Sequence, residues 1–416
     1  MAKKISKQPQ KPVRLFGERV QTPDESVFQV DNTSQQYYNS PYYVAHANAV
    51  QPIPPGGSSA MNLADVIGQG GVDAITQAGK IVFHMVGDTG AAKTTGPITE
   101  ANVADMMVKD FDTPVAADRP SFFFHLGDVI YYFGEEQYYY DQFYEPFRLY
   151  NAPIFAIPGN HDGVIYQATA KSLGAFINNF CSPFPQHSPN AGTLVRTTMN
   201  QPNVYFTLDA PFVSIIGLYS NVLEGPGVIS SQNGVYPLVD DQKKFLIAEL
   251  QRLRPQRIKN AIAIIVAVHH PPFSGDQNHS GSTGLMNDLD DAFKKAGLVP
   301  DMVLSGHAHL YQRFTRVINK SSVPYIISGS GGFAVTPLKD LTGGVPIKTP
   351  FQQNPKGPTL EKYVPAFGYL KLMAASGMIG VQFSSTDPVY GPNADSIFVD
   401  LKTRSIIAGK PGKNLI

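Results

Sequence analysis

The sequence predicts an α/β protein whose sheets are mainly parallel. Short runs rich in β-branched and aromatic residues alternate along the chain with stretches in which apolar residues recur at helical spacing. Several of these short runs are apolar throughout, which is typical of strands buried on both faces of a sheet. Hydrophobic residues make up 43% of the 416 residues, enough to form a large core.

The chain begins with a polar region, residues 1–58, which is rich in Gln, Asn, Pro and Tyr. We expect this region to form an irregular extension. Residues 59–416 contain no strong domain boundary, so we expect them to form a single domain. Its core motifs lie within residues 80–332 and its closing strands within residues 366–408.

The alternation can be followed in order from residue 59. A weak helical pattern at 59–78, interrupted at Gly70-Gly71, comes first. Strands are predicted at 80–86, 121–126, 153–157, 204–208, 212–218, 261–268, 301–304, 314–318 and 323–327, and helices at 98–111, 135–150, 167–180, 239–253 and 285–296. A loop rich in Pro and Gly then runs to about residue 365. Closing strands are predicted at 369–374, 378–383 and 396–401.

Several elements carry further local signals. The strand at 261–268 is fully apolar and is therefore expected at the centre of a sheet. Asp240 and Asp241 stand in the first turn of the helix at 239–253, where carboxylates interact favourably with the helix dipole. The segment Asp209-Ala210-Pro211 joins two strands that we expect to be neighbours.

The composition excludes several classes of function. Lys+Arg and Asp+Glu both number 33, so the formal charge is zero, which argues against a nucleic-acid polymer or a membrane surface as the partner. The single cysteine, Cys181, excludes an intramolecular disulfide and a cysteine-rich metal site. The longest apolar run, 261–268, is too short to span a membrane. No apolar secretory segment follows the basic N-terminus, so we expect a soluble, cytoplasmic protein. The oligomeric state is not indicated.

Polar residues follow five of the predicted strands. The five segments are Gly87-Asp88-Thr89-Gly90, Gly127-Asp128-Val129-Ile130-Tyr131, Gly159-Asn160-His161-Asp162, Val266-Ala267-Val268-His269 and Gly306-His307-Ala308-His309. In α/β proteins, functional sites form outside the carboxyl ends of the strands. Residues i and i+2 of an extended segment point the same way, so His307 and His309 can face one site.

Without Asp162, these segments supply two carboxylates, one phenol, one amide and four histidines. Mixed oxygen and nitrogen donors suit iron, zinc or manganese. Eight donor residues exceed the needs of one ion and indicate a two-metal site. Such sites hold ions about 3.5–4 Å apart and stabilise the attacking and leaving oxygens of a displacement.

The ordered set GDxG, GDxxY, GNH followed by an acid, VxxH and GHxH resembles the calcineurin-like metallophosphoesterase superfamily, and most closely its purple acid phosphatase group. The resemblance runs from Lys80 to about Gly332. It implies a four-layer αββα sandwich of two mixed β-sheets flanked by helices, with residues 59–416 as a single catalytic domain. It also implies a small-molecule phosphate ester as the substrate.

The resemblance implies a role for each candidate ligand. The first metal would be bound by Asp88, Asp128, Tyr131 and His309, and Asp128 would bridge to a second metal completed by Asn160, His269 and His307. The common form of the first motif has a histidine where this chain has Gly90, and Tyr131 takes that place. Because a phenolate favours a trivalent ion, the resemblance implies iron(III) in the first site, and iron(II), zinc or manganese in the second.

Two further histidines receive catalytic roles from the same resemblance. His161 would bind the phosphate or protonate the leaving oxygen, and His279, ten residues after His269, would bind the substrate. The implied reaction is hydrolysis of phosphate monoesters by a metal-bound hydroxide. A phosphodiesterase acting on cyclic nucleotides or lipid headgroups is the alternative. A scaffold protein without turnover would be expected to lose ligands that this chain keeps.

Other residues receive structural interpretations. His84 and His125 lie inside predicted strands and are expected to be hydrogen-bonded core residues, and His270 is expected to be structural. The segment from Gly87 to Thr94 nearly matches a P-loop, but we expect Gly96-Pro97 to break the helix that a P-loop needs. Nucleotide triphosphate hydrolysis is therefore not favoured.

Overall fold

The structure is a computed structural model. It describes residues 59–90, 96–163, 171–182, 186–194, 196, 200–220, 227–234, 238–259, 261–341 and 344–408. The expected irregular extension, residues 1–58, lies outside the described residues, as do residues 91–95 of the segment that resembles a P-loop. Among the described residues, no helix is both long enough and apolar enough to cross a lipid bilayer.

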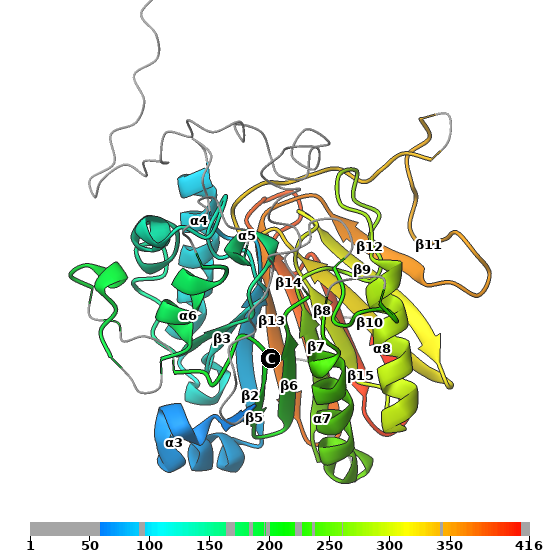
Figure 1. Cartoon of the computed structure of the whole chain (residues 1–416), viewed down its shortest axis with the longest axis horizontal. Coiled ribbons are helices and arrows are strands. Elements are labelled where there is room, and N and C mark those ends of the chain that lie inside the picture. Colours follow the sequence, from blue (N-terminus) through cyan, green and yellow to red (C-terminus); the bar gives the residue numbers. More distant parts are fainter. Residues whose placement is uncertain are drawn as a thin grey trace, which may run out of the picture.

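Two mixed β-sheets form the centre of the molecule (Figure 1). The larger sheet contains β1 (Ala60–Asn62), β5 (Phe206–Ala210), β6 (Val213–Leu218), β7 (Ala263–Val268), β8 (Met302–Ser305), β9 (Tyr311–Ile318), β10 (Ser321–Ser328), β11 (Phe351–Gln352) and β12 (Thr359–Val364). Its strand order is β1-β5-β6-β7-β8-β10-β9-β12-β11. Strands β6, β7, β8 and β10 run parallel to one another, as the apolar runs predict.

The smaller sheet contains β2 (Lys80–Val86), β3 (Phe123–His125), β4 (Ile154–Ala156), β13 (Gly368–Ala375), β14 (Met378–Ser385), β15 (Asp395–Asp400) and β16 (Ser405–Ala408). Its strand order is β16-β15-β14-β13-β2-β3-β4. Strands β2, β3 and β4 are parallel, whereas β13 to β16 form an antiparallel meander that joins the sheet beside β2. The closing strands of the chain therefore complete the sheet that its first buried strand begins.

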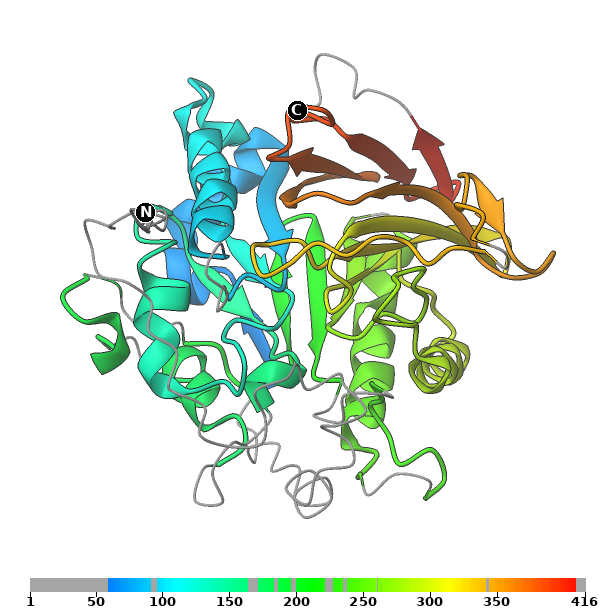
Figure 2. The same ribbon diagram turned by 90° about the horizontal axis from the view of Figure 1, so that it is seen from above.

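Helices cover the outer faces of both sheets (Figures 1 and 2). These helices are α4 (Gly96–Lys109), α6 (Gly174–Phe180), α7 (Asp241–Ile258) and α8 (Thr283–Ala296). Two other helices lie elsewhere: α3 (Ala64–Ala78) packs against the apolar residues between the sheets, and α5 (Asn160–Gly163) follows β4. Residues of α4 and α6 share a buried cluster with the smaller sheet, and residues of α7 and α8 share one with the larger sheet. A third cluster fills the space between the sheets. These four layers confirm the predicted αββα sandwich.

The alternation of side chains along β2 shows how the layers are held together. Ile81, Phe83 and Met85 point into the cluster between the sheets, whereas Val86 belongs to the cluster under the helices. Because successive residues of a strand face opposite sides, a strand buried on both faces is mostly apolar, and the one buried polar residue of β2, His84, is paired with Asp110. Such a strand ends where polar residues begin, and the carboxyl ends of β2, β3, β4, β7 and β8 lead into the five polar segments.

Two predicted helices differ from the structure. The helix predicted at 135–150 is instead a 3₁₀ turn at Glu136–Tyr138 and a π-helical turn at Tyr140–Tyr144. The π-helical turn holds Gln142, whose side chain bonds the backbone of Tyr131. The helix predicted at 167–180 is described only from residue 171 onward, and there it is α6 alone.

Three element boundaries also differ. Helix α7 continues past Pro255 to Ile258, where Arg257 pairs with the buried Asp301. The break in α3 lies at Gly68 and not at Gly70-Gly71. The predicted loop after residue 332 contains the strands β11 and β12. Their few apolar residues lie among Pro and Gly and give no clear strand pattern.

Helix α4 begins at Gly96, so Gly96-Pro97 forms its start, and Lys93-Thr94, where a P-loop helix would open, lies outside the described residues. Proline is tolerated in the first turn of a helix, because a backbone N–H in that turn would have no acceptor within the helix.

Candidate metal centre

The structure brings all nine predicted site residues together at the carboxyl ends of the parallel strands of both sheets. Asp88 follows β2, Asp128 and Tyr131 follow β3, Asn160 and His161 begin α5 after β4, His269 follows β7, and His307 and His309 follow β8. His279 reaches the same place from the loop before α8. All nine are buried. The edge shared by two packed sheets therefore gathers polar groups that lie far apart in the sequence.

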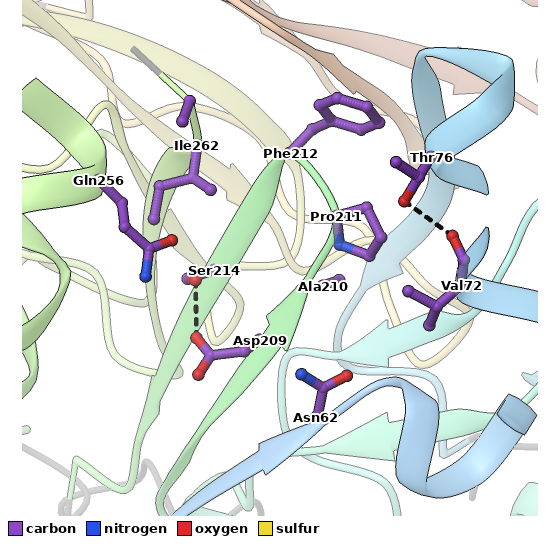
Figure 3. A pocket seen from close by; sticks show the side chains of 11 residues that line it. Asn62, Val72, Thr76, Asp209, Ala210, Pro211, Phe212, Ser214, Gln256 and Ile262 are labelled. Atoms are coloured by element: carbon purple, nitrogen blue, oxygen red, sulfur yellow. Dashed lines mark hydrogen bonds between the residues drawn. The ribbon is translucent and has the colours of Figure 1, made fainter. Parts of the chain in front are cut away.

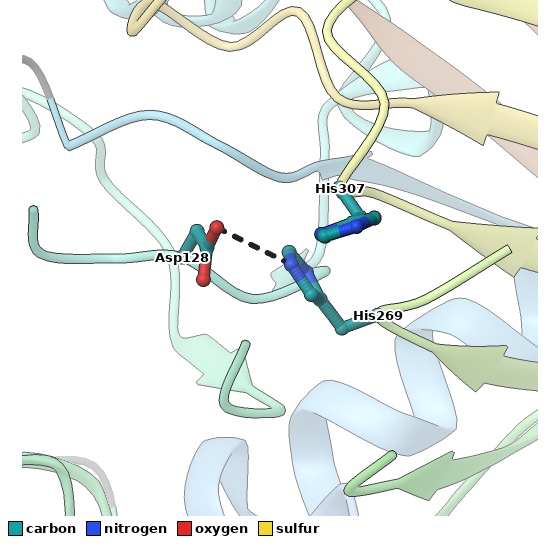
Figure 4. A group of neighbouring side chains, drawn as sticks. All are labelled: Asp128, His269 and His307. Atoms are coloured by element: carbon teal, nitrogen blue, oxygen red, sulfur yellow. Dashed lines mark ion pairs between the residues drawn. The ribbon is translucent and has the colours of Figure 1, made fainter. Parts of the chain in front are cut away.

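One group of donor atoms surrounds the amide of Asn160. Its Oδ1 lies 3.0 Å from Nε2 of His269 and 3.0 Å from Nδ1 of His307. Oδ2 of Asp128 lies 3.3 Å from the same His269 nitrogen. Figure 4 shows the carboxylate and the two rings pointing toward one another. These four residues are the ones expected around the second metal.

A second group of donor atoms surrounds the phenol of Tyr131. Its hydroxyl oxygen lies 3.0 Å from Oδ1 of Asp88, 2.9 Å from Oδ2 of Asp128 and 3.4 Å from Nε2 of His309. The His309 nitrogen also lies 3.4 Å from Oδ1 of Asp88. These four residues are the ones expected around the first metal.

Asp128 belongs to both groups through a single atom. Its Oδ2 faces Tyr131 on one side and His269 on the other. Its Oδ1 instead accepts a hydrogen bond of 2.9 Å from the backbone N–H of His161. The carboxylate is thus oriented with one oxygen directed between the two groups, the position that a bridging ligand occupies.

The spacing of the donor atoms fits metal ions. Nitrogen and oxygen ligands lie about 2.1 Å from a bound transition metal, so neighbouring ligand atoms are about 3.0–3.4 Å apart in tetrahedral or octahedral geometry. The separations between Asn160, His269 and His307, and those around Tyr131, fall close to this range. The donor set therefore fits two ions of the type expected.

The backbone at the candidate ligands is unusual. Asp88, Asp128 and His307 have positive φ angles of 58°, 55° and 67°. Such angles are uncommon for residues with a side chain and are typical of functional sites. Glycine is required beside them, since a Cβ on Gly159 would lie 2.0 Å from Oδ1 of Asp128. The glycines of the motifs thus allow one strand end to approach another.

Groups outside the donor set orient it. Nδ1–H of His269 donates to the carbonyl oxygen of Leu126 over 2.8 Å, which directs Nε2 toward the site. The carboxylate of Asp162 accepts hydrogen bonds from the backbone N–H groups of Val129, Ile130 and Gly159. Asp162, the acid that completes the third motif, thereby joins the second and third motifs.

Gln142 orients Tyr131 in a comparable way. Its Oε1 accepts from the backbone N–H of Tyr131, and its Nε2 donates to the carbonyl oxygen of Tyr131, each over 2.9 Å. The ring of Phe333 stacks on the phenol with centroids 3.7 Å apart. A Cβ on Gly90 would lie 2.8 Å from Oε1 of Gln142. The carbonyl oxygen of Val129 would lie closer still, at 2.3 Å, so this backbone group and Gln142 together fill the space that a histidine at position 90 would need.

Burial and mutual contact shift the pKa values of the site. Burial alone would raise the pKa of Asp128, but the His269 and His161 rings hold it well below its usual range. Although burial opposes the shift, Asp128 raises the pKa of His269 to about 10. Burial, with the Asp128 and Asp88 carboxylates, raises the pKa of Tyr131. An imidazolium thus balances the carboxylates, and a bound cation would take over that role and release protons.

His161 and His279 lie on the border of the donor set. Nδ1–H of His161 donates to the carbonyl oxygen of Tyr132 over 2.7 Å, and its ring lies 4.2 Å from the Tyr131 ring. The ring of His279 lies 4.7 Å from that of His307 and 4.8 Å from that of His309. His279, to which the resemblance assigns substrate binding, therefore lies beside two of the candidate ligands.

The histidines interpreted as structural have the contacts expected of them. His84 pairs with Asp110 over 2.9 Å, and His125 lies 2.9 Å from the Thr89 hydroxyl. Nδ1 of His270 lies 2.7 Å from the Ser220 hydroxyl.

Four orienting residues escaped the sequence analysis: Gln142, Phe333, Asp276 and Thr336. Asp276 stands three residues before His279, a spacing suited to a turn that a side chain caps, which is a weak signal. Gln142 acts across 11 residues, and Phe333 and Thr336 act across longer separations, so none of the three carries a local signal.

A separate cavity of about 410 Å³ lies at the amino ends of β6 and β7, whereas the candidate metal centre lies at the carboxyl ends of the strands (Figure 3). Its walls come from α3, α7 and the turn between β5 and β6, including Thr76, Asp209, Phe212 and Gln256. It shares no residue with the candidate metal centre.

Comparison with known families agrees with this geometry. A calcineurin-like phosphoesterase family profile matches residues 83–311, which is more than half of the chain and spans all five motifs. The protein belongs to the calcineurin-like phosphoesterase family.

Among characterised relatives, purple acid phosphatases are similar to this chain. Purple acid phosphatase 22 of Arabidopsis thaliana is 25% identical over 265 residues, covering 61% of this chain and 50% of the relative. Purple acid phosphatase 15 of the same organism is 25% identical over 186 residues, covering 43% of this chain and 29% of the relative. The chain thus spans half or less of the length of these curated relatives.

Solved structures share the fold. Purple acid phosphatase PPD1 from yellow lupin (Lupinus luteus) has a TM-score of 0.52 and 15% identity, covering 77% of this chain and 54% of that one. GAP50 of Plasmodium, described as the anchor in the inner membrane complex, has a TM-score of 0.52 and 18% identity, covering 81% and 91%. At these identities the likeness shows the fold alone.

Proposed function

We propose that the protein hydrolyses phosphate monoesters at a two-metal centre, within a single catalytic domain formed by residues 59–416. The observation that carries this proposal is the position of Asp128, whose Oδ2 faces both groups of donor atoms. A bridging carboxylate between two such groups suits phosphoryl transfer to water, in which both the attacking and the leaving oxygen need stabilisation. Similarity to purple acid phosphatases favours monoesters.

The residues around the phenol of Tyr131 would hold the first ion, and those around the amide of Asn160 would hold the second. When bound, the ions would supply Lewis acidity, which acidifies water and neutralises charge on the phosphoryl oxygens. We propose iron(III) for the first site, since a phenolate ligand such as that of Tyr131 favours a trivalent ion. Iron(II), zinc or manganese would occupy the second site.

His161 would assist the leaving group. Its backbone N–H donates to Asp128 and its Nδ1–H donates to the carbonyl oxygen of Tyr132, so both the backbone and the ring of His161 are held. Nε2 is the atom on the opposite side of the ring and would hold or deliver a proton at the leaving oxygen. A fixed donor of this type contributes typically 10²–10⁴-fold to a rate.

The proposal is tested with two chromogenic substrates and metal analysis on the same preparation. We expect two metal ions per chain and faster turnover of p-nitrophenyl phosphate than of bis(p-nitrophenyl) phosphate. Faster turnover of the diester would replace the proposal with a phosphodiesterase built on the same residues. Two bound ions without turnover of either ester would instead support a non-catalytic role on this fold.

A further inference from the structure

His279 approaches the candidate metal centre from a loop that is itself held in place. Its ring lies beside both His307 and His309, which belong to different groups of donor atoms. A side chain in this position can reach a phosphoryl group bound between the two groups. The contribution of His279 to the reaction then depends on the groups that orient its ring.

The carboxylate of Asp276 faces the His279 ring. Its Oδ1 accepts hydrogen bonds from the backbone N–H groups of Asn278 and His279, over 2.6 and 2.8 Å, and lies 3.5 Å from Nδ1 of His279. Nδ1 is buried and makes no hydrogen bond to the described residues, so the Asp276 carboxylate meets this edge of the ring through a charged contact. Because the two ring nitrogens lie on different edges of the imidazole, Nε2 is the one left to face the centre.

Thr336 joins this carboxylate to the strand end that carries His309. Its hydroxyl donates to Oδ2 of Asp276, and its backbone N–H donates to the carbonyl oxygen of His309 over 2.9 Å. The surrounding backbone is paired as well, with Asp276 opposite Leu338 in an isolated β-bridge. The loop of His279 and the segment after the last motif are therefore held as one unit.

We propose that Asp276 and Thr336 are positioning residues that orient His279 toward the phosphoryl group of the substrate. This inference rests on the proposed function. Asp276 fixes the edge of the ring that faces away from the substrate, and Thr336 fixes Asp276 relative to His309. Neither residue touches the substrate itself.

Binding of inorganic phosphate to the metal-loaded protein tests the inference by isothermal titration calorimetry, which requires no turnover. We expect His279→Ala and Asp276→Asn each to weaken phosphate binding about tenfold or more, the effect of losing a hydrogen bond to a charged group. The double variant should bind phosphate no more weakly than His279→Ala alone, because Asp276 acts through His279. Metal content and melting temperature should show that each variant remains folded and loaded.

Thr336 provides a second and milder test. Thr336→Val keeps the shape but removes the hydroxyl, whereas Thr336→Ser keeps the hydroxyl. We expect the valine variant to weaken phosphate binding and the serine variant to bind as the wild type does. The two Thr336 variants test the proposed positioning role even if Asp276→Asn does not fold.

Three results would overturn the inference: unchanged phosphate affinity in Asp276→Asn, multiplied losses in the double variant, or equal behaviour of the two Thr336 variants. They are distinguishable from failure of the proposed function. That failure would appear as a wild-type protein that binds phosphate and metals but hydrolyses no ester.

Discussion

Two clusters that contain histidine, aspartate and tyrosine begin only four residues apart along the chain, at His84 and at Asp88. The outer cluster, under the helical layer of the smaller sheet, consists of His84, Asp110, Tyr150, Tyr369 and Lys371. The second cluster is the candidate metal centre. Both contain histidine, aspartate and tyrosine, so the presence of these three residue types does not explain why one cluster is expected to bind metals.

The difference lies in charge balance and in backbone geometry. In the outer cluster, Asp110 accepts from Tyr369 and pairs with both His84 and Lys371, so a lysine supplies the balancing positive charge. His84 lies within the regular strand β2. In the candidate metal centre, imidazoles and a phenol surround the carboxylates, and Asp88 and Asp128 have positive φ angles. A polar cluster completed by a lysine is suited to stability, whereas one of converging ligand atoms is suited to cations.

The largest expected difference between the clusters concerns their central carboxylates. Asp128→Ala removes the only side chain shared by both groups of donor atoms, so we expect loss of both metals and at least about a thousandfold loss of turnover. Asp110→Asn is the matched control and should keep full metal content and turnover. Atomic absorption and p-nitrophenyl phosphate hydrolysis measure both. Retention of two ions by Asp128→Ala would show that Asp128 does not bridge them.

Substitution of a histidine should also have different effects on turnover in the two clusters. His161→Ala should lower turnover by about 10²–10⁴-fold with both metals retained, because His161 is expected to act on the leaving group and not as a ligand. His84→Gln should leave the turnover of the folded protein unchanged. Metal content and steady-state rates on one preparation distinguish the outcomes. A parallel loss of metal and rate in His161→Ala would give that residue a structural role.

The phenols offer a spectroscopic comparison. If Tyr131 binds iron(III), the protein should carry a visible charge-transfer band, which Tyr131→Phe abolishes. Iron affinity should fall by more than the roughly 10–100-fold typical for loss of a residue that only supports a ligand. Tyr150→Phe, in the outer cluster, should leave the band in place. Absorption spectra at known iron content provide the measurement. A colourless wild-type protein with full iron occupancy would contradict the assignment of Tyr131.

Local patterns predicted the part of the site that lies on the strands. Each of the five motifs is contiguous and follows an apolar strand, so the sequence places Asp88, Asp128, Asn160, His269 and His307 at strand ends, and the fold brings those ends together. The turn at 140–144 was predicted wrongly because Gln142 bonds the backbone of Tyr131, a contact invisible to helical periodicity.

Contacts across long separations escaped prediction for the same reason. Asp276 and Thr336 meet across 60 residues, and no periodicity or spacing relates them. The strand β12 lies between Pro- and Gly-rich segments and forms by pairing with β9 rather than from its own pattern. The sequence therefore indicates which residues can bind a metal more readily than which residues hold them in place.

The outer cluster should contribute to stability in a way that depends on pH. Burial would raise the pKa of Asp110, but His84 and Lys371 lower it to about 2, below the model-peptide value of 3.8. A carboxyl group whose pKa is depressed by folding stabilises the protein above its unfolded pKa, and this contribution is lost as pH falls through the folded pKa. Asp110→Asn should therefore lower the free energy of unfolding by about 2 kcal/mol at pH 7.

The decisive measurement is the pH dependence of that loss. Urea unfolding of both proteins should show a constant difference from pH 7 down to about pH 5, which then shrinks between about pH 4 and pH 2 as the wild-type carboxyl group becomes protonated. Lys371→Met is the companion variant, because it removes one of the charges that keep Asp110 ionised and should shift the same loss to higher pH. A difference that does not change with pH would mean that Asp110 stabilises the fold through packing and hydrogen bonds, so that charge balance would no longer separate the two clusters.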